Sequence, residues 1–410
     1  MKKEHPVTKA LIKWYKKEHR DLPWRTDPTP YHVWLSEIML QQTRVEAVKG
    51  YYARFLDAVP DIAALAEADE EKLLKLWEGL GYYSRVRNMQ KAARVIMEAY
   101  GGEMPHEAAE LKKLPGIGDY TAAAVASIAF GKREAVVDGN VLRVMARLLE
   151  DDRDIALAET KRAVQAEIAA SYLPEAKRVA HRKTAGDGLP EEDARCGTFN
   201  QSLMELGAVI CVPNGAPLCD TCPVYAFCEA GRHGTWDSYP VKSAKKARRI
   251  EQKTVLLLCD RTRVAIRKRP AKGLLAGLYE YPLVDGHLTE QRLRKLLKEE
   301  KVPALRIRRL EDAKHIFTHI EWHMRGYLVE TEELSTAPHK PPRGASAPGA
   351  SKRTRVRSTG VPAIPGEAGG SYELPRTLIF ADRTDIDRVY AIPSAFRVYT
   401  NVVKQMLPPS

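Results

Sequence analysis

The stretch Leu114-Pro-Gly-Ile-Gly118 lies between residues 107–113 and 119–130, two segments whose composition predicts helices. Glycine adopts positive φ angles without steric cost, so two glycines in five residues predict a tight turn between these helices. The second helix then presents, at its first turn, N–H groups without intrahelical partners, and a phosphate can bind there. Gly116 and Gly118 are therefore candidate contacts to a nucleic-acid backbone, although an ordinary corner between helices has the same pattern.

Residues 1–230 predict a mainly helical domain, because apolar residues recur every three or four positions. Residues 231–252 are polar and basic and predict a linker between domains. Residues 253–410 predict an α+β domain, with a helix near 290–297. Its expected strands are 254–259, 264–266, 278–281, 316–317, 327–329 and 378–380. Residues 335–371 predict a disordered basic loop, and 177–197 predict a surface insertion.

The overall composition restricts the class of protein. A chain of 410 residues with 44% hydrophobic residues is globular and long enough for two or three domains. No apolar run is long enough to cross a membrane, and the first 19 residues contain no apolar signal core, so we expect neither a membrane protein nor a secreted one. The net charge of +12 favours a polyanionic partner.

Four of the six cysteines lie close together, with the spacing C-x7-C-x2-C-x5-C. They are Cys211, Cys219, Cys222 and Cys228. Four thiolates at this spacing can hold an iron–sulfur cluster or a zinc ion, and the spacing alone does not choose between them. Cys196 and Cys259 are not expected to be ligands.

Two further stretches identify a family. Trp34-Leu-Ser-Glu-Ile-Met-Leu-Gln-Gln-Thr43 and Gly79-Leu-Gly-Tyr-Tyr-Ser-Arg85 resemble the MutY-type adenine DNA glycosylases of the helix-hairpin-helix superfamily, which also contains endonuclease III. The resemblance covers most of residues 5–230 and, more weakly, 250–405. It implies a helix-hairpin-helix glycosylase domain with an iron–sulfur module at 205–230, followed by a Nudix-like lesion-recognition domain. It also implies a monomer, cytoplasmic and associated with the nucleoid, that removes adenine mispaired with 8-oxoguanine or guanine in double-stranded DNA.

Breaking an N-glycosidic bond needs a proton on the leaving base and negative charge beside the developing sugar cation. Glu37 shares a helix face with apolar residues, so desolvation is expected to raise its pKa. The resemblance makes Glu37 the general acid at adenine N7. Asp138, in Val136-Val-Asp-Gly-Asn140, is an expected helix N-cap that stays ionised, and the resemblance gives it the cation-stabilising role. Asn140 is expected to orient Asp138 or a water molecule.

Position 120 separates two kinds of glycosylase. Endonuclease III-type glycosylase/AP lyases, the alternative assignment, carry there a lysine whose amine attacks the sugar. This chain has Tyr120, and a phenol cannot form a Schiff base, so base removal without efficient strand cleavage is expected.

The target adenine must leave the base stack to be reached. By resemblance, Gln42 and Tyr82 enter the duplex. The expected adenine pocket consists of Leu22, Trp24, Arg25, Val45 and Gln201.

The resemblance also implies that the four cysteines hold a [4Fe-4S] cluster. The family usually has six residues between the first two cysteines, whereas this chain has seven.

In the second domain, Gly277-Leu-Tyr-Glu-Tyr-Pro282 resembles the strand that enters a Nudix fold. No Glu-rich metal-binding box follows it, so pyrophosphate hydrolysis is not expected. Phe317, Thr318 and His319 match the Phe-Ser-His loop with which the family recognises 8-oxoguanine, with Thr in place of Ser. A lesion-binding protein without enzymatic activity is the remaining alternative.

Overall fold

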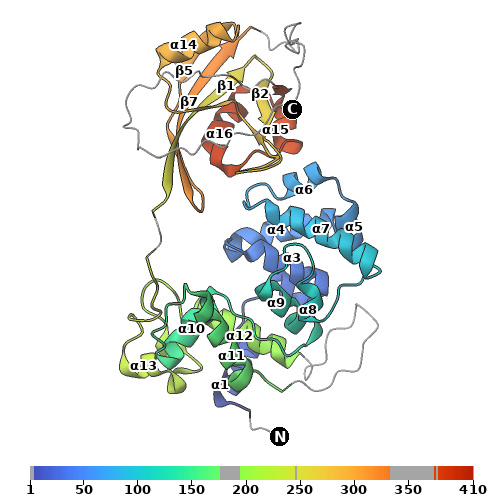
Figure 1. Ribbon diagram of the computed structural model, residues 1–410, viewed down its shortest axis with the longest axis vertical. Helices are drawn as coiled ribbons and strands as arrows, with labels where there is room; N and C mark the ends of the chain where they lie inside the picture. Colours follow the sequence, from blue (N-terminus) through green and yellow to red (C-terminus); the bar gives the residue numbers. More distant parts are fainter. Residues whose placement is uncertain (1–3, 176–193, 245–246, 333–373, 375–376, 410) are drawn as a thin grey trace, which may run out of the picture. The chain divides into compact units, whose positions relative to one another are not determined.

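The computed structural model describes residues 4–175, 194–244, 247–332, 374 and 377–409. They belong to two compact units, Met1–Lys246 and Ala247–Ser410, each with its own core (Figure 1). The basic loop predicted at 335–371 lies outside the described residues, as do residues 177–193 of the predicted insertion. Within the described ranges, no helix combines the length and apolarity that crossing a bilayer requires.

The described part of the first unit is helical. Three helices begin with proline, whose fixed φ angle and missing N–H suit the first helical position. The helices are α1 (Pro6–Glu18), α2 (Pro23–Thr26), α3 (Pro30–Leu40), α4 (Val45–Ala58), α5 (Ile62–Glu67), α6 (Glu70–Leu76), α7 (Ser84–Ala99), α8 (Ala108–Leu111), α9 (Asp119–Phe130), α10 (Gly139–Leu149), α11 (Ala158–Glu167), α12 (Arg195–Val209) and α13 (Glu229–His233).

The predicted helix-hairpin-helix consists of α8, the turn at Leu114–Gly118, and α9. Gly116 has a φ of +78°, and a Cβ atom there would lie 2.6 Å from Asn88 Cβ, so this position requires glycine. Gly118 differs from the expectation: its backbone is extended (φ −93°, ψ −178°), and it serves as the N-cap of α9. The first helix is also shorter than predicted, because it ends at Leu111.

A large core of the first unit lies among α1, α10, α11 and α12. The start of α12 is part of this packing, since Cys196 is buried and Gly197 is in close contact with α9. A Cβ atom on Gly197 would lie 2.6 Å from the Ser127 carbonyl oxygen. The prediction of a surface insertion up to residue 197 is therefore wrong at residues 195–197, which belong to a buried helix.

The second unit is built around a mixed sheet with the strand order β3-β2-β1-β7-β5. The side chains of β1 alternate between two cores: one holds Val255 and Leu257, the other Leu256 and Leu258. Helices α15 and α16 cover the first face and α14 the second (Figure 1). The elements are β1 (Arg249–Cys259), β2 (Val264–Lys268), β3 (Tyr279–Glu280), β4 (Leu283–Asp285), α14 (Glu290–Glu299), β5 (Ala304–Arg309), β6 (Ala313–Ile316), β7 (Ile320–Thr331), β8 (Ile379–Ala381), α15 (Arg383–Arg388) and α16 (Arg397–Met406).

Two boundaries differ from the sequence-based expectation. Residues 249–252 of the predicted linker pair with β7 in the sheet, and residues 231–233 belong to α13. Strand β5 was not expected, because its side chains are mostly exposed and include Arg306, Arg308 and Arg309. An edge strand without an apolar face lacks the alternation from which strands are predicted.

Candidate functional site

A cavity of about 420 Å³ lies in the first unit, and its lining residues come from α2, α3, α4, α9, α10, α11, α12 and the segments next to them. Its wall contains ten of the predicted site residues: Leu22, Trp24, Arg25, Glu37, Gln42, Val45, Tyr120, Asp138, Asn140 and Gln201. They come from segments that are far apart in the sequence. Tyr82, Gly116 and Gly118 do not line this cavity, and Phe317, Thr318 and His319 belong to the second unit.

Glu37 lies on α3 and is only 8% exposed. Its Oε2 accepts a hydrogen bond of 2.6 Å from the Tyr120 hydroxyl group. Burial raises the pKa of Glu37 to about 7, and the charge of Asp138 acts in the same direction. The Tyr120 hydrogen bond and the Arg25 charge oppose this shift. A carboxyl group with a pKa near 7 can be protonated and donate its proton at neutral pH.

Asp138 is the N-cap of α10, as expected. Its Oδ1 accepts a hydrogen bond from Val141 N (2.8 Å), and its Oδ2 accepts one from Asn140 Nδ2 (2.9 Å). Burial nevertheless raises the pKa of Asp138, while these hydrogen bonds lower it. Asn140 is held in turn by Arg143, whose Nη2 donates to Asn140 Oδ1 (2.9 Å) and whose Nε donates to the Cys211 carbonyl (2.8 Å).

The cavity wall also contains a buried ion network that the sequence analysis missed. Glu205 on α12 is 1% exposed, and its carboxylate accepts hydrogen bonds from Arg20 Nε and Nη2 and from Arg25 Nη2, each 2.8 Å long. Although burial opposes it, pairing with the two guanidinium groups lowers the pKa of Glu205 to about 2. Glu205 lies four residues after Gln201, on the same helix face, but this spacing does not indicate which charges it would meet. This carboxylate holds Arg25 in place beside Glu37.

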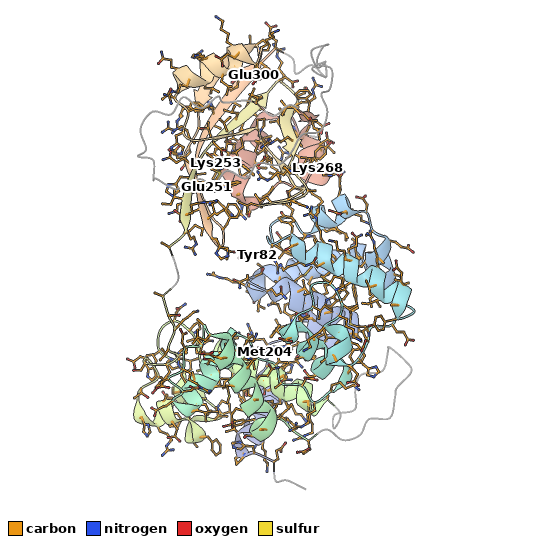
Figure 2. The ribbon with its side chains drawn as sticks, viewed as in Figure 1. Tyr82, Met204, Glu251, Lys253, Lys268 and Glu300 are labelled. Atoms are coloured by element: carbon orange, nitrogen blue, oxygen red, sulfur yellow. The ribbon has the colours of Figure 1, made fainter. Side chains whose placement is uncertain are left out.

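Met204 and Lys161 are among the other cavity residues that the sequence analysis did not predict. Met204 lies on α12, and its Sδ is 3.4 Å from the Tyr120 hydroxyl oxygen (Figure 2). Lys161 on α11 brings an amine to the cavity wall, although position 120 lacks one. Nothing in the local sequence distinguishes Lys161 from an ordinary solvated lysine on a helix.

Gln42 and Tyr82 are exposed residues in unusual backbone conformations. Their φ angles are +60° and +47°, and Tyr82 is 50% exposed at the loop that precedes α7 (Figure 2). A non-glycine residue with positive φ costs energy, so the surrounding structure must hold it there.

The four cysteines line one cavity of about 30 Å³, together with Arg147, Tyr225 and Trp236. Among the donors that reach the sulfur atoms, Arg147 Nη1 lies 3.3 Å from Cys211 Sγ, and Gly231 N lies 3.3 Å from Cys228 Sγ. No three His, Cys, Asp or Glu side chains in the described ranges are spaced to hold a single metal ion. The seventh residue of the first gap is accommodated in an exposed loop, residues 213–216, where Gly215 has a φ of +77°.

In the second unit, Phe317, Thr318 and His319 form the tip of the hairpin between β6 and β7. Thr318 and His319 are exposed, while the Phe317 ring packs edge-on against Trp322 with a centroid distance of 5.0 Å. Backbone bonds tie the tip to β1, because Arg249 N donates to the His319 carbonyl (3.1 Å).

Two family models and several curated relatives match this chain. The family described as "HhH-GPD superfamily base excision DNA repair protein" matches residues 35–170, and the NUDIX domain family matches residues 254–361. The mouse (Mus musculus) adenine DNA glycosylase is 36% identical over 388 residues, which cover 80% of this chain and 72% of the relative. The human (Homo sapiens) adenine DNA glycosylase is 35% identical over 393 residues, covering 81% and 68%. A solved structure of a thermostable thymine-DNA glycosylase is 26% identical, with a TM-score of 0.45, and covers 55% of this chain and 95% of its own.

The predicted fold class, a helical helix-hairpin-helix domain followed by an α+β Nudix-like domain, is confirmed by the two family matches and the two units. Relatives more than 30% identical cover most of both this chain and their own length. The chain therefore belongs to the adenine DNA glycosylase family of base excision repair.

Proposed function

We propose that this enzyme removes adenine opposite 8-oxoguanine or guanine, using Glu37 as the proton donor and Asp138 as the cation-stabilising carboxylate. The observation that carries the proposal is that both carboxyl groups line one cavity of about 420 Å³. The wall also contains the aromatic and polar residues expected to contact adenine, so an extruded base entering it meets both groups.

The two carboxyl groups take different roles because their surroundings differ. Glu37, whose pKa burial raises to about 7, gives its proton to adenine N7, so the base leaves as a neutral molecule. Asp138 is held by Val141 N and Asn140, and its negative charge stabilises the sugar cation that remains. A water molecule then completes the abasic product, with Asn140 holding Asp138 in position.

We assign the phosphate contact to the helix-hairpin-helix turn at Gly116 and Gly118, and duplex entry to Gln42 and Tyr82. Both assignments follow from the family resemblance, and the exposure of Gln42 and Tyr82 supports the second. The exposed tip formed by Phe317, Thr318 and His319 is assigned to recognition of the base opposite adenine.

The decisive experiment compares single-turnover adenine release from A:8-oxoguanine, A:G and A:T duplexes, with and without alkali. We expect release from the first two to exceed release from A:T by at least about 100-fold, because a site whose polar groups are left unpaired by the wrong partner can discriminate by up to about 10⁴–10⁵-fold. Strand breaks should require alkali, because Tyr120 supplies no amine. Equal rates on all three duplexes would contradict the proposal.

One observation favours a second candidate function, an endonuclease III-type glycosylase/AP lyase: Lys161 lines the same cavity. Its amine would condense with the C1′ aldehyde of the abasic product, lose water to form an imine, and allow β-elimination of the 3′ phosphate. Strand breaks without alkali, together with a borohydride-trapped protein–DNA adduct that Lys161→Gln abolishes, would establish this activity.

We further propose that Cys211, Cys219, Cys222 and Cys228 hold a [4Fe-4S] cluster. Four cysteine thiolates can hold either a zinc ion or a four-iron cluster. The four thiols line one cavity, which supports a shared metal centre, and the family resemblance favours the iron–sulfur cluster over zinc. The donors from Arg147 and Gly231 suit charged sulfur ligands. When bound, the cluster would stabilise this loop, and we assign it no chemical step.

The protein purified without added metal should therefore absorb at about 400 nm, as iron–sulfur proteins do. Cys222→Ser should abolish the band, whereas the control Cys196→Ser, a thiol outside the cavity, should retain it. One zinc ion per chain without a visible band would contradict the assignment.

A further inference from the structure

Arg85 is a buried cation directly after the Tyr82 loop, in the first turn of α7, and it is 8% exposed. Burial lowers its pKa to about 10. None of the ion pairs found among the described residues involves Arg85. Removing a charge from water without a counter-ion is costly, so hydrogen bonds must replace the lost hydration.

One side of the guanidinium group binds the end of α3. Arg85 Nη1 donates to the carbonyl oxygens of Ile38 (2.6 Å), Met39 (3.1 Å) and Gln41 (2.7 Å). The last carbonyls of a helix have no intrahelical partners and carry the negative end of its dipole, so they suit a cation. These bonds fix the backbone immediately before Gln42.

The other side binds the Tyr82 loop. Arg85 Nη2 donates to the carbonyl oxygens of Leu80 (3.0 Å) and Gly81 (3.1 Å). The guanidinium carbon also lies 5.6 Å from the centre of the Tyr82 ring, at cation–π distance. One side chain therefore joins two segments that are about forty residues apart in the sequence.

We propose that Arg85 is a positioning residue that joins the Gln42 turn to the Tyr82 loop, so that both side chains enter the duplex as one rigid wedge. The inference rests on the proposed duplex-entry role of Gln42 and Tyr82 and adds the element that makes them act together. Both residues hold positive φ angles, and the five carbonyl contacts of Arg85 supply the surrounding structure that such backbones need.

Lysine is the informative replacement, because its ammonium group keeps the charge but concentrates its donors at one point and cannot bridge both segments. Arg87→Lys is the matched control: Arg87 lies on the same helix, and its Nε pairs with Glu70 of α6 (2.7 Å). The probe is a duplex with 2-aminopurine in place of the target adenine, whose fluorescence rises when the base leaves the stack. We expect Arg85→Lys to slow extrusion about tenfold, a coupling typical of residues in direct contact. Arg87→Lys should behave like the wild type.

Slow extrusion by Arg85→Lys could also come from a loss of folded protein. Two double-mutant cycles exclude this explanation, and they are measured below the unfolding temperature of every variant. If Arg85 acts through the wedge, Arg85→Lys should add little to Tyr82→Ala. In the second cycle, the losses of extrusion rate in Gln42→Ala and Tyr82→Ala should also be non-additive. This cycle keeps Arg85, so its result does not depend on whether Arg85→Lys folds. The pH at which adenine release declines should be the same in Arg85→Lys as in the wild type, because Glu37 is unaffected.

The outcomes separate this inference from the proposed function. Additive losses in either cycle, or normal extrusion by Arg85→Lys, would overturn the coupling while leaving the duplex-entry role intact. Normal extrusion by both Gln42→Ala and Tyr82→Ala would overturn the duplex-entry role itself, and the coupling with it.

Discussion

Glu37→Gln should lower the single-turnover rate of adenine release by roughly three orders of magnitude, within the range that a positioned acid contributes. Glutamine has the same shape and can still accept the hydrogen bond from the Tyr120 hydroxyl group, but it has no proton to transfer at neutral pH. The dissociation constant for an A:8-oxoguanine duplex should change little, because the substitution leaves the DNA-facing residues in place.

Two controls accompany this substitution. Glu46→Gln changes an exposed glutamate at the first turn of α4, outside the cavity, and should leave the rate unchanged. Because burial raises the pKa of Glu37 above that of the unfolded chain, protonated Glu37 stabilises the fold at low pH, and this stability is lost as the pH rises through about 7. Glu37→Gln should therefore be at least as stable as the wild type at pH 8. Near-normal turnover in a folded variant would exclude Glu37 as the acid.

Asp138→Asn should lower the rate of adenine release by about 100-fold or more, the scale at which removing one preorganised electrostatic group acts. Asparagine caps helices about as well as aspartate, so the start of α10 should remain intact and only the charge beside the sugar is lost. The measurement is the single-turnover rate together with the unfolding temperature.

Asp138→Ala separates the two roles of this residue. It removes both the charge and the cap, so it should lose rate as Asp138→Asn does and in addition about 1 kcal/mol of stability. A rate for Asp138→Asn close to that of the wild type would leave the residue with its capping role alone.

Much of the site could be predicted from short stretches of sequence because the chemistry restricts the residue types. A carboxyl group on an apolar helix face, Glu37, and a carboxyl group before a helix, Asp138, line one cavity as the family resemblance implied. The hairpin could also be predicted from the sequence, because both the φ angle at position 116 and the close contact with Asn88 require glycine there.

What could not be predicted depends on contacts between distant segments. Glu205 pairs with Arg20 and Arg25 across about 180 residues, and no local pattern reports which charges meet in the interior. Arg85 lies within the family motif Gly79–Arg85, yet its partners are backbone carbonyls, which every residue carries. Side-chain types alone therefore cannot reveal such a bridge.

In the second unit, the sequence did not predict which strands pair with each other. β1 and β7 run parallel over eleven residue pairs, although the paired residues, such as Arg249 and Ile320, lie 71 positions apart in the chain. Parallel neighbours require a long crossover, so adjacency in the sequence gives no sign of them.

The central claim is that Glu37 delivers a proton from a buried carboxyl group whose pKa lies near 7. Its most direct test is the single-turnover rate of adenine release measured from pH 5 to pH 9. The wild-type rate should fall about tenfold per pH unit above about pH 7, as the protonated fraction of Glu37 declines. Tyr120→Phe should move this decline to higher pH, because the tyrosine hydrogen bond lowers the pKa of Glu37. A wild-type rate that stays constant from pH 6 to pH 9, or a decline that persists unchanged in Glu37→Gln, would contradict the claim.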